Sequence, residues 1–456
     1  MMQAISSLDG RYYKKTRALA PFFSEQALMK YRVMVECKYL IALSLSKKTK
    51  LRAFSKKEIK NLESLYEKFN DNSYEKIKNF EETVNHDVKA VEYFIKEKMS
   101  KMSLKDSIEW VHFALTSEDT NNLAYGLILS ENTEKVLLPK LREIEKELGF
   151  LAKRYKNLPM LARTHGQPAS PTTFGKEMNV FARRLGRGLD HLLGQKILVK
   201  LNGASGNYNA HVVAYPKVDW LRFSGNFIAD LNKKLMFKLE LNEVTTQIEP
   251  HDSYIELFDR FRRFNSILID LNQDIWRYIS DNWITQKPKT GEVGSSTMPH
   301  KINPIDFENS EGNLGLANAL FEFFARKLPI SRLQRDLSDS TVERNFGTAF
   351  GHSFLAYVML QKGLSKISVN ENKIKEDLFA HPEVIAEAIQ TILRREGTEF
   401  PYEKLKELTR GKEVTMKDFA IFIDTLKVSA KIKLELKKIN PLNYIGLASE
   451  IAGKSF

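Results

Sequence analysis

Residues 291–304 concentrate side chains that could perform acid–base chemistry or bind an anion. Ser295 and Ser296 supply adjacent hydroxyls, while Lys301 and Asn303 supply an ammonium and an amide. The apolar residues of this run follow neither a helical nor a strand period, and glycine and proline punctuate it, so the run predicts a loop. Because binding and catalytic groups are often carried on loops, we infer that this one holds an anion.

Three further polar runs interrupt the predicted helices near their ends: residues 83–92, 116–122 and 163–169. Thr116, with Asp119 three residues later, approximates a capping box. A helix cap and an anion site use the same free backbone N–H groups. The sequence therefore leaves two interpretations of Thr116 and Ser117 open, a plain cap and a ligand contact.

Two histidines in these runs differ in their surroundings. His86, taken alone, is typical of a hydrogen-bonded structural histidine. His165 lies between Arg163 and Gln167 on no apolar face, so its neighbours favour a structural and a chemical role equally. A general acid that works near neutral pH needs a pKa in that range, which imidazole provides.

Sequence motifs for metals and nucleotides are missing. There is no His-Glu-x-x-His, no cysteine pair, no aspartate-rich calcium loop and no P-loop. The single cysteine, Cys37, lies among apolar residues, so we expect a buried thiol and no disulfide. We expect no metal and no cofactor, which leaves proton transfers and eliminations as the reactions open to these groups.

Long amphipathic helices must position these runs. Along residues 257–278, apolar side chains recur at alternating steps of four and three, which places them on one face of about six turns. The same spacing recurs in residues 137–155, 178–192, 314–328 and 346–364. Five such helices with few strand-like alternations predict an all-α bundle. Their apolar faces are wider than one partner would cover, so we expect bundling between subunits.

The 456 residues are too many for one ordinary core. The first part of the chain is rich in lysine and shorter helical patterns, and the last part is punctuated by proline and glycine. We predict three helical domains, at residues 1–106, 107–364 and 365–456, with the long bundle in the second.

The net charge of +13 raises the possibility of nucleic-acid binding. The lysines, however, are mixed with glutamates, as at residues 56–58 and 433–437, and aromatic residues do not alternate with them as stacking would require. A basic solvated surface, suited to small polyanionic substrates, is the favoured interpretation. The N-terminus has no signal pattern, and no apolar run approaches the roughly 18 residues of a membrane span. We expect a cytoplasmic protein without nucleic-acid or membrane partners.

Residues 294–304 resemble the signature of the fumarase/aspartase superfamily, whose members cleave C–N or C–O bonds of succinyl compounds and release fumarate. His300 in this signature, residues 164–169 and residues 85–93 are similar to the adenylosuccinate lyases of that superfamily, in their bacterial form. The resemblance covers essentially the whole chain. Its further matches are residues 9–12, 116–119, 246–251, 306–313, 334–336 and 401–409.

The resemblance implies β-elimination of fumarate from adenylosuccinate and from succinyl-aminoimidazole carboxamide ribotide in purine biosynthesis. Ser295 is then the general base and His165 the general acid. His86 contacts the phosphate end and helps to place the acid, and Lys301 stabilises the doubly charged aci-carboxylate intermediate. The other positions implied to bind substrate are Arg11, Tyr12, Asn85, Asp87, Thr116, Ser117, Gln247, Ser296, Ile302, Asn303, Asn309, Arg335, Ser340, Thr341, Val342, Glu343 and Arg344.

The resemblance also implies a homotetramer with a central multi-helix core, in which three subunits build each active site. Two alternatives stay open. One is another superfamily member, such as argininosuccinate lyase or a cycloisomerase, against which residues 85–93 and the phosphate-suited Arg11 and Arg344 argue. The other is a non-catalytic structural or nucleic-acid-binding homologue, against which the intact Ser295 and His165 argue.

Overall fold

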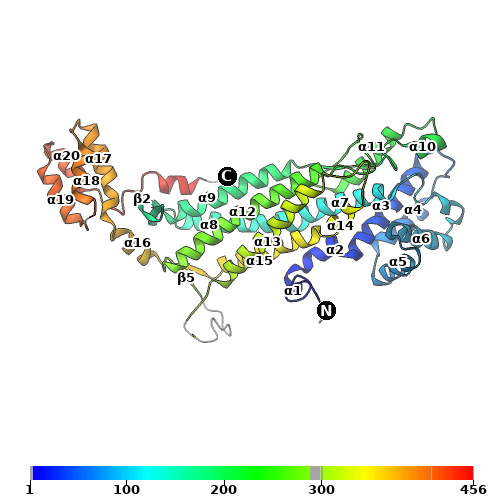
Figure 1. Ribbon diagram of the computed structural model, residues 1–456, viewed down its shortest axis with the longest axis horizontal. Coiled ribbons are helices and arrows are strands. Elements are labelled where there is room, and N and C mark those ends of the chain that lie inside the picture. Colours follow the sequence, from blue (N-terminus) through cyan, green and yellow to red (C-terminus); the bar gives the residue numbers. More distant parts are fainter. Residues whose placement is uncertain (1–3, 288–297, 299–300, 412, 455–456) are drawn as a thin grey trace. The chain divides into compact units, whose positions relative to one another are not determined.

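The structure, a computed structural model, describes residues 4–287, 298, 301–411 and 413–454. Helices dominate these residues, which confirms the predicted all-α class (Figure 1). The sequence patterns did not predict the short strands β1 to β6, which pair into three two-stranded sheets.

The chain divides into two compact units, each assembled from three separate segments. The first unit comprises Met1–Leu141, Gly188–Ser266 and Gly312–Val358, and the second comprises Arg142–Arg187, Ile267–Glu311 and Met359–Phe456. The predicted three domains, divided at residues 106 and 364, rest on sequence patterns rather than on contacts and stay a prediction.

Five long helices contribute residues to both units. They are α8 (Leu138–Arg154), α9 (Phe174–Leu193), α12 (Asp252–Ser280), α13 (Ile305–Lys327) and α15 (Phe346–Leu364). The burial of these helices confirms the predicted apolar faces. In α12, the residues Leu257, Phe261, Phe264 and Leu268 are each at most 1% exposed. Burying such a side chain stabilises a fold by about 1.5–3 kcal/mol relative to leaving it in water.

The first unit also contains shorter helices and one parallel strand pair, in which Ile197 is opposite Leu239. Its remaining elements are α1 (Tyr13–Thr16), η1 (Arg17–Leu19), α2 (Ala20–Phe23), α3 (Glu25–Ser46), α4 (Lys56–Glu67), α5 (Asp71–Val84), α6 (Asp87–Ser100), η2 (Lys105–Trp110), α7 (Ser117–Asn132), η3 (Thr133–Leu137), β3 (Ile197–Val199), α10 (Asn209–Ala214), α11 (Trp220–Leu231), η4 (Asn232–Lys234), β4 (Leu239–Leu241) and α14 (Ser338–Glu343).

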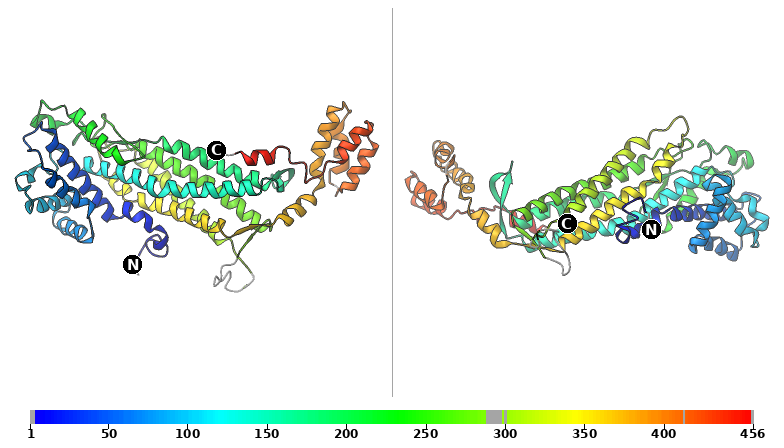
Figure 2. Two further views of the ribbon diagram at one scale, coloured as in Figure 1. Left: turned by 180° about the vertical axis from the view of Figure 1, so that it is seen from behind. Right: turned by 60° about the horizontal axis from the view of Figure 1, so that its bottom comes forward.

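Phenylalanine rings from α12, α13 and α15 fill the core of the first unit. The ring centroids of Phe258 and Phe346 are 4.9 Å apart, and Phe350 lies 5.2 Å from Phe261 and 5.1 Å from Phe321. Edge-to-face pairs of this kind add to the stabilisation that comes from burial alone. Segments of these helices lie side by side in each view (Figures 1 and 2).

The second unit contains two antiparallel strand pairs and the C-terminal helices. Its remaining elements are β1 (Pro159–Thr164), β2 (Gln167–Thr173), β5 (Ile284–Gln286), β6 (Ile367–Val369), α16 (Glu371–Phe379), η5 (Pro382–Ile385), α17 (Ala386–Arg395), α18 (Pro401–Thr409), α19 (Met416–Thr425), α20 (Ala430–Lys437) and α21 (Ala448–Gly453). In the β5–β6 pair, Ile284 is opposite Val369, which ties the segment after α12 to the segment after α15.

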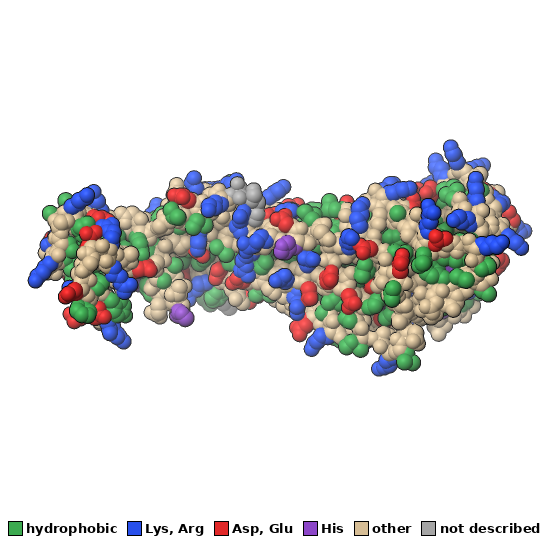
Figure 3. Space-filling model, turned by 90° about the horizontal axis from the view of Figure 1, so that it is seen from above, with side chains coloured by type: hydrophobic (Ala, Val, Ile, Leu, Met, Phe, Trp, Pro, Cys, Tyr) green, Lys and Arg blue, Asp and Glu red, His purple; other side chains and the backbone are tan. Residues whose placement is uncertain are grey.

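Charge is mixed on the face of the molecule that Figure 3 shows. On the face in Figure 3, Lys and Arg side chains are interspersed with Asp and Glu and do not form one continuous stripe. None of the helices in the described part of the chain is long and apolar enough to cross a membrane.

Candidate active site

The junction between α5 and α6 carries the first group of predicted site residues. Asn85 ends α5 with a left-handed φ of 51°, and His86 follows in extended conformation as the N-cap of α6. The His86 ring accepts a hydrogen bond at Nδ1 from the backbone N–H of Lys89, at 3.2 Å. A neutral ring that accepts at Nδ1 carries its proton on Nε2, so Nε2 is the nitrogen left to donate to a ligand.

Asp87, the first residue of α6, lies between two arginines. Its Oδ2 is 2.8 Å from Nη2 of Arg32 and 2.6 Å from Nη2 of Arg344. Arg32 is 1% exposed and also donates from Nε to Oδ1 of Asn121, at 2.9 Å. Burial by itself would raise the pKa of Asp87, but the two guanidinium groups hold it well below its usual range. The carboxylate therefore stays ionised and fixes one edge of Arg344.

Thr116 and Ser117 begin α7, where the free N–H groups of a helix N-terminus favour anions. The predicted cap at Thr116 is confirmed, since its backbone N–H donates to Oδ2 of Asp119 at 2.9 Å. Asp119 is fully buried and also accepts from Nζ of Lys200, at 2.7 Å, and from the backbone N–H of Asn202, at 3.1 Å. One carboxylate thus holds both the start of α7 and the segment after β3.

Gln247 lies in a loop that is tied to the same segment. Its Nε2 donates to the backbone oxygen of Ala204 at 3.1 Å, and Nδ2 of Asn202 donates to Oγ1 of Thr245 at 2.8 Å. Thr116 and Gln247, both predicted to bind substrate, are therefore connected through Asn202 and its neighbours.

A buried cluster of charged side chains joins α7, α14 and the start of α12. Nη2 of Arg335 lies 3.1 Å from Oε2 of Glu118, and its Nε lies 3.2 Å from Oδ2 of Asp339. Nε2 of His251 lies 3.2 Å from Oε1 of Glu343. Apart from Arg335, whose side chain is 12% exposed, these residues are at most 3% exposed.

The cluster has more carboxylates than cations, so it retains protons. Burial, with the nearby charge of Glu343, raises the pKa of Glu118 to about 8, although Arg335 opposes the shift. Burial would lower the pKa of His251, but Glu343 outweighs it and raises that pKa. Glu118, His251 and Glu343 bring potential metal ligands within 4.8 Å of one another. Because the guanidinium of Arg335 already supplies a cation beside them, the cluster does not require a metal.

The rest of α14 carries further predicted residues. The backbone N–H of Ser340 donates to Oδ1 of Asp339 at 2.6 Å, and the backbone oxygen of Thr341 accepts from Nδ2 of Asn345 at 3.0 Å. Val342 is 7% exposed and contributes to packing. The helix ends at Glu343, which leaves Arg344 as its C-cap.

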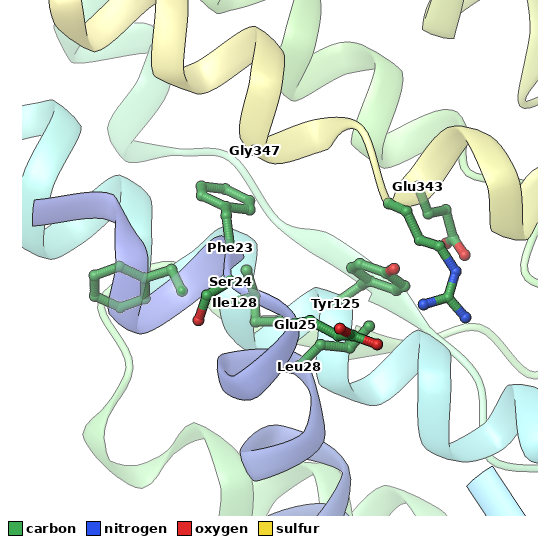
Figure 4. Close-up of a pocket in the computed structure, with 10 residues that line it drawn as sticks. Phe23, Ser24, Glu25, Leu28, Tyr125, Ile128, Glu343 and Gly347 are labelled. Carbon is green, nitrogen blue, oxygen red and sulfur yellow. The ribbon is translucent and has the colours of Figure 1, made fainter. Parts of the chain in front are cut away.

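Two cavities of about 250 Å³ each border Arg344. Figure 4 shows the first, with Glu343, Glu25 and Tyr125 around it. The second is lined by residues from the N-terminal segment, including Asp9 and Thr16. Arg11 and Tyr12 of this segment are predicted to bind substrate, and the guanidinium carbon of Arg11 is 5.8 Å from the centre of the Tyr12 ring.

The second unit holds the predicted acid. In the β1–β2 hairpin, Thr164 is opposite Gln167, so His165 and Gly166 form a two-residue loop. Their φ angles of 53° and 75° are left-handed, as a type I′ turn requires. His165 is exposed and lies at the tip of the hairpin.

The second unit also holds the described part of the signature. The backbone N–H of Lys301 donates to the oxygen of Met298 at 3.1 Å, and the oxygen of Ile302 accepts from Nε2 of Gln286 at 3.2 Å. The predicted residues Asn303 and Asn309 belong to this unit as well. Ser295 and Ser296, together with His300, lie outside the described residues, so their roles stay predictions.

Sequence reasoning missed four charged residues next to the predicted site: Arg32, Glu118, His251 and His112. A signal was present for Arg32, since it interrupts an apolar stretch of α3 between Tyr31 and Val33. Glu118 and His251 belong to segments that resemble the superfamily, residues 116–119 and 246–251. Nothing in the spacing of these segments indicated that the two side chains would lie in one cluster.

His112 lies just before Thr116, with a left-handed φ of 61°. Its Nδ1 is 2.6 Å from Oε1 of the buried Glu36, which also accepts from Oγ1 of Thr120 at 2.6 Å. Burial disfavours the charged imidazole, but Glu36 outweighs it and raises the pKa of His112 to about 8. The loop that leads into α7 therefore carries a cationic imidazole at neutral pH.

Two family models match the chain. Residues 10–318 match the family described as "Lyase", and residues 331–445 match the one described as "Adenylosuccinate lyase C-terminal". The curated adenylosuccinate lyase of Dictyostelium discoideum is 52% identical and covers 98% of this chain and 97% of its own length. That of Haemophilus influenzae is 50% identical, covering 99% and 98%, and that of Escherichia coli K12 is 49% identical, covering 98% and 97%.

Two solved structures share the fold at 17% sequence identity. The fumarate lyase from Mesorhizobium sp. BNC1 superposes with a TM-score of 0.75 and covers 96% of both chains. The 3-carboxy-cis,cis-muconate lactonizing enzyme from Pseudomonas putida superposes with a TM-score of 0.74 and covers 96% of this chain and 95% of its own.

Proposed function

The chain belongs to the adenylosuccinate lyases of the fumarase/aspartase superfamily, and from that membership we propose that it cleaves adenylosuccinate into AMP and fumarate. It is a C–N lyase of purine biosynthesis, and we extend the proposal to succinyl-aminoimidazole carboxamide ribotide on the route to IMP. The observation that carries the proposal is identity of about half of all positions over nearly the full length of several curated adenylosuccinate lyases.

The proposed reaction starts with the removal of a proton from Cβ of the succinyl group by Ser295. The C–H electron pair then forms a doubly charged aci-carboxylate, which the ammonium of Lys301 stabilises. The pair next forms the C=C bond of fumarate as the C–N bond breaks, and His165 gives a proton to the departing nitrogen. This role for Ser295 rests on the match of residues 294–304 to the superfamily signature.

The remaining predicted residues are assigned to the two anionic ends of the substrate, the phosphate and the succinyl carboxylates. The proposal assigns the phosphate to Arg11, Tyr12, His86, Arg335 and Arg344, all of which belong to the first unit. It assigns the succinyl carboxylates to Lys301, Asn303 and the first turn of α7 with Thr116 and Ser117. Support for the second assignment comes from the free N–H groups and the dipole of a helix that is 16 residues long.

We propose a homotetramer in which three chains build each active site. Exposed apolar residues support assembly, since Leu316 and Phe323 of α13 are two turns apart on one face and are 55% and 45% exposed. His86 belongs to the first unit, whereas His165 and Lys301 belong to the second. Assembly of several copies would allow residues from both units of different chains to meet.

The proposal places the enzyme in the cytoplasm without nucleic-acid or membrane partners. The mixed charge on the face in Figure 3 supports the absence of nucleic-acid partners, because nucleic-acid binding favours a continuous basic stripe. The two alternative functions are not favoured. The C-terminal match to adenylosuccinate lyases disfavours another superfamily enzyme, and retention of Ser295 and His165 disfavours a non-catalytic protein.

The direct test is incubation of the purified protein with adenylosuccinate, followed by chromatography of the products. We expect AMP and fumarate in equal amounts without added metal, and the same result in the presence of a chelator. Argininosuccinate serves as the control substrate and should give no fumarate. If argininosuccinate is cleaved and adenylosuccinate is not, the proposed function is wrong.

A further inference from the structure

The guanidinium group of Arg335 is held along one edge only. Nη2 faces Glu118 at 3.1 Å and Nε faces Asp339 at 3.2 Å, whereas Nη1 forms no ion pair with any of the described residues. Both carboxylates are buried, at 0% and 3% exposed, while the arginine side chain is 12% exposed. An arginine clamped in this way can offer the remaining N–H groups to an incoming anion.

Glu118 connects this arginine to a second part of the site. It follows Ser117 directly and lies in the first turn of α7, whose N-terminus we assign to a substrate carboxylate. A shift of Glu118 would therefore move both the cap at Thr116 and the guanidinium of Arg335. The capping bond between Thr116 and Asp119 limits such shifts, since it fixes the same turn.

A second buried ion pair, between His251 and Glu343, holds the end of α14. The imidazole of His251 holds Glu343 at 3.2 Å, and Glu343 directly precedes Arg344, which bonds to Asp87. His251 has a left-handed φ of 67°, a conformation that costs free energy in a residue other than glycine. The surrounding structure therefore imposes this position on the imidazole, as expected for a side chain that must reach one particular partner.

We propose that Glu118 is a positioning residue that acts through Arg335: together with Asp339 it aims the guanidinium at the anionic nucleotide. This inference rests on the proposed function, because it takes Arg335 to be a nucleotide contact. Glu118 itself does not touch substrate and takes no part in proton transfer.

A double-mutant cycle on the full-length enzyme tests the inference, with AMP affinity measured by calorimetry. Measured at pH 9, above the raised pKa of about 8 of Glu118 so that its carboxylate is ionised, Glu118→Gln should weaken AMP binding on the order of tenfold, which is within the range of couplings between contacting residues. In an Arg335→Lys background, which removes the planar fork that Glu118 aligns, Glu118→Gln should change the affinity less than twofold. Glu145→Gln is the matched control, since Glu145 is also buried, at 7% exposed, and pairs with Arg142 at 2.9 Å.

Two results would overturn the inference while leaving the proposed function intact. One is unchanged AMP affinity in Glu118→Gln, and the other is an equal loss in both backgrounds, which would mean that Glu118 acts independently of Arg335. If Glu118→Gln does not fold, Asp339→Asn goes through the same cycle with the same expected pattern. Failure of the wild-type protein to bind AMP or to cleave adenylosuccinate would instead contradict the proposed function.

Discussion

Nη2 of Arg344 lies 2.6 Å from Oδ2 of Asp87, although the two residues are 257 positions apart in the sequence. This pair joins the first residue of α6 to the end of α14 and brings two predicted substrate-binding segments into contact. Arg32 approaches the same carboxylate from α3 and is itself almost fully buried. Three elements of the first unit therefore depend on one aspartate.

Replacing Asp87 by asparagine should destabilise the protein by about 3 kcal/mol, because the buried Arg32 loses its countercharge. Urea unfolding followed by circular dichroism measures the change. Asp424→Asn is the control, since Asp424 pairs with Lys437 at 2.6 Å but is 60% exposed, and exposed pairs contribute at most about 1 kcal/mol. Equal effects of the two substitutions would contradict the importance of the Asp87 pair.

The His112–Glu36 pair should make stability depend on pH in a defined direction. The folded-state pKa of His112 is raised to about 8, above the value of about 6.5 of an unfolded histidine. Its stabilisation is therefore complete below about pH 6.5 and is lost as pH rises through about 8. Urea unfolding from pH 6 to 9 should show a decline that is smaller in His112→Gln; the rest comes from Glu118, whose raised pKa of about 8 acts in the same direction. His191→Gln is the control, since His191 is exposed. If the stability of His112→Gln declines with pH as much as that of the wild type, the His112–Glu36 pair does not contribute to the pH dependence.

Lys200 and Asp119 form an ion pair whose side chains are both 0% exposed, at 2.7 Å. Lys200→Met should cost about 3–5 kcal/mol, because it leaves a buried carboxylate without its countercharge. Lys196→Met provides the matched control, since Lys196 pairs with Glu240 but is 65% exposed. We expect its cost to stay under about 1 kcal/mol. If Lys200→Met lowers the stability by a similarly small amount, the backbone N–H groups around Asp119 are enough to stabilise its buried carboxylate without Lys200.

Ser295→Ala should abolish turnover of adenylosuccinate, because the variant has no group to remove the Cβ proton. Assembly and AMP binding should be retained, since the substitution removes one hydroxyl and leaves the anion-binding groups in place. Sedimentation, calorimetry and a fumarate assay separate these properties. Full activity of the variant would exclude Ser295 as the base.

Mixing two inactive variants tests whether active sites are shared between chains. His165→Ala should lose activity as Ser295→Ala does, because the leaving nitrogen has no proton donor. When the two variants are dissociated together and reassembled, random mixing should restore about one site in four if the residues come from different subunits. No recovery in verified mixed tetramers would contradict the shared-site proposal, and each variant reassembled alone is the control.

Much of the fold follows from local patterns that the sequence displays. The 3.6-residue periodicity of apolar side chains predicted α8, α9, α12, α13 and α15, because a helix must bury one face. The cap at Thr116 followed from residue types three positions apart. The hairpin that carries His165 was missed, since the strands around it show no alternation of apolar and polar residues.

The sequence by itself determined the family, the long helices and the residues expected to do the chemistry. These depend on residue types at fixed local spacing. Only the tertiary structure decided that Glu118 would meet Arg335, that His251 would meet Glu343 and that Asp87 would lie between two arginines. Such pairs join residues far apart in the chain. Their contact is set by how whole helices pack, and the low dielectric of the interior then makes each pairing energetically important.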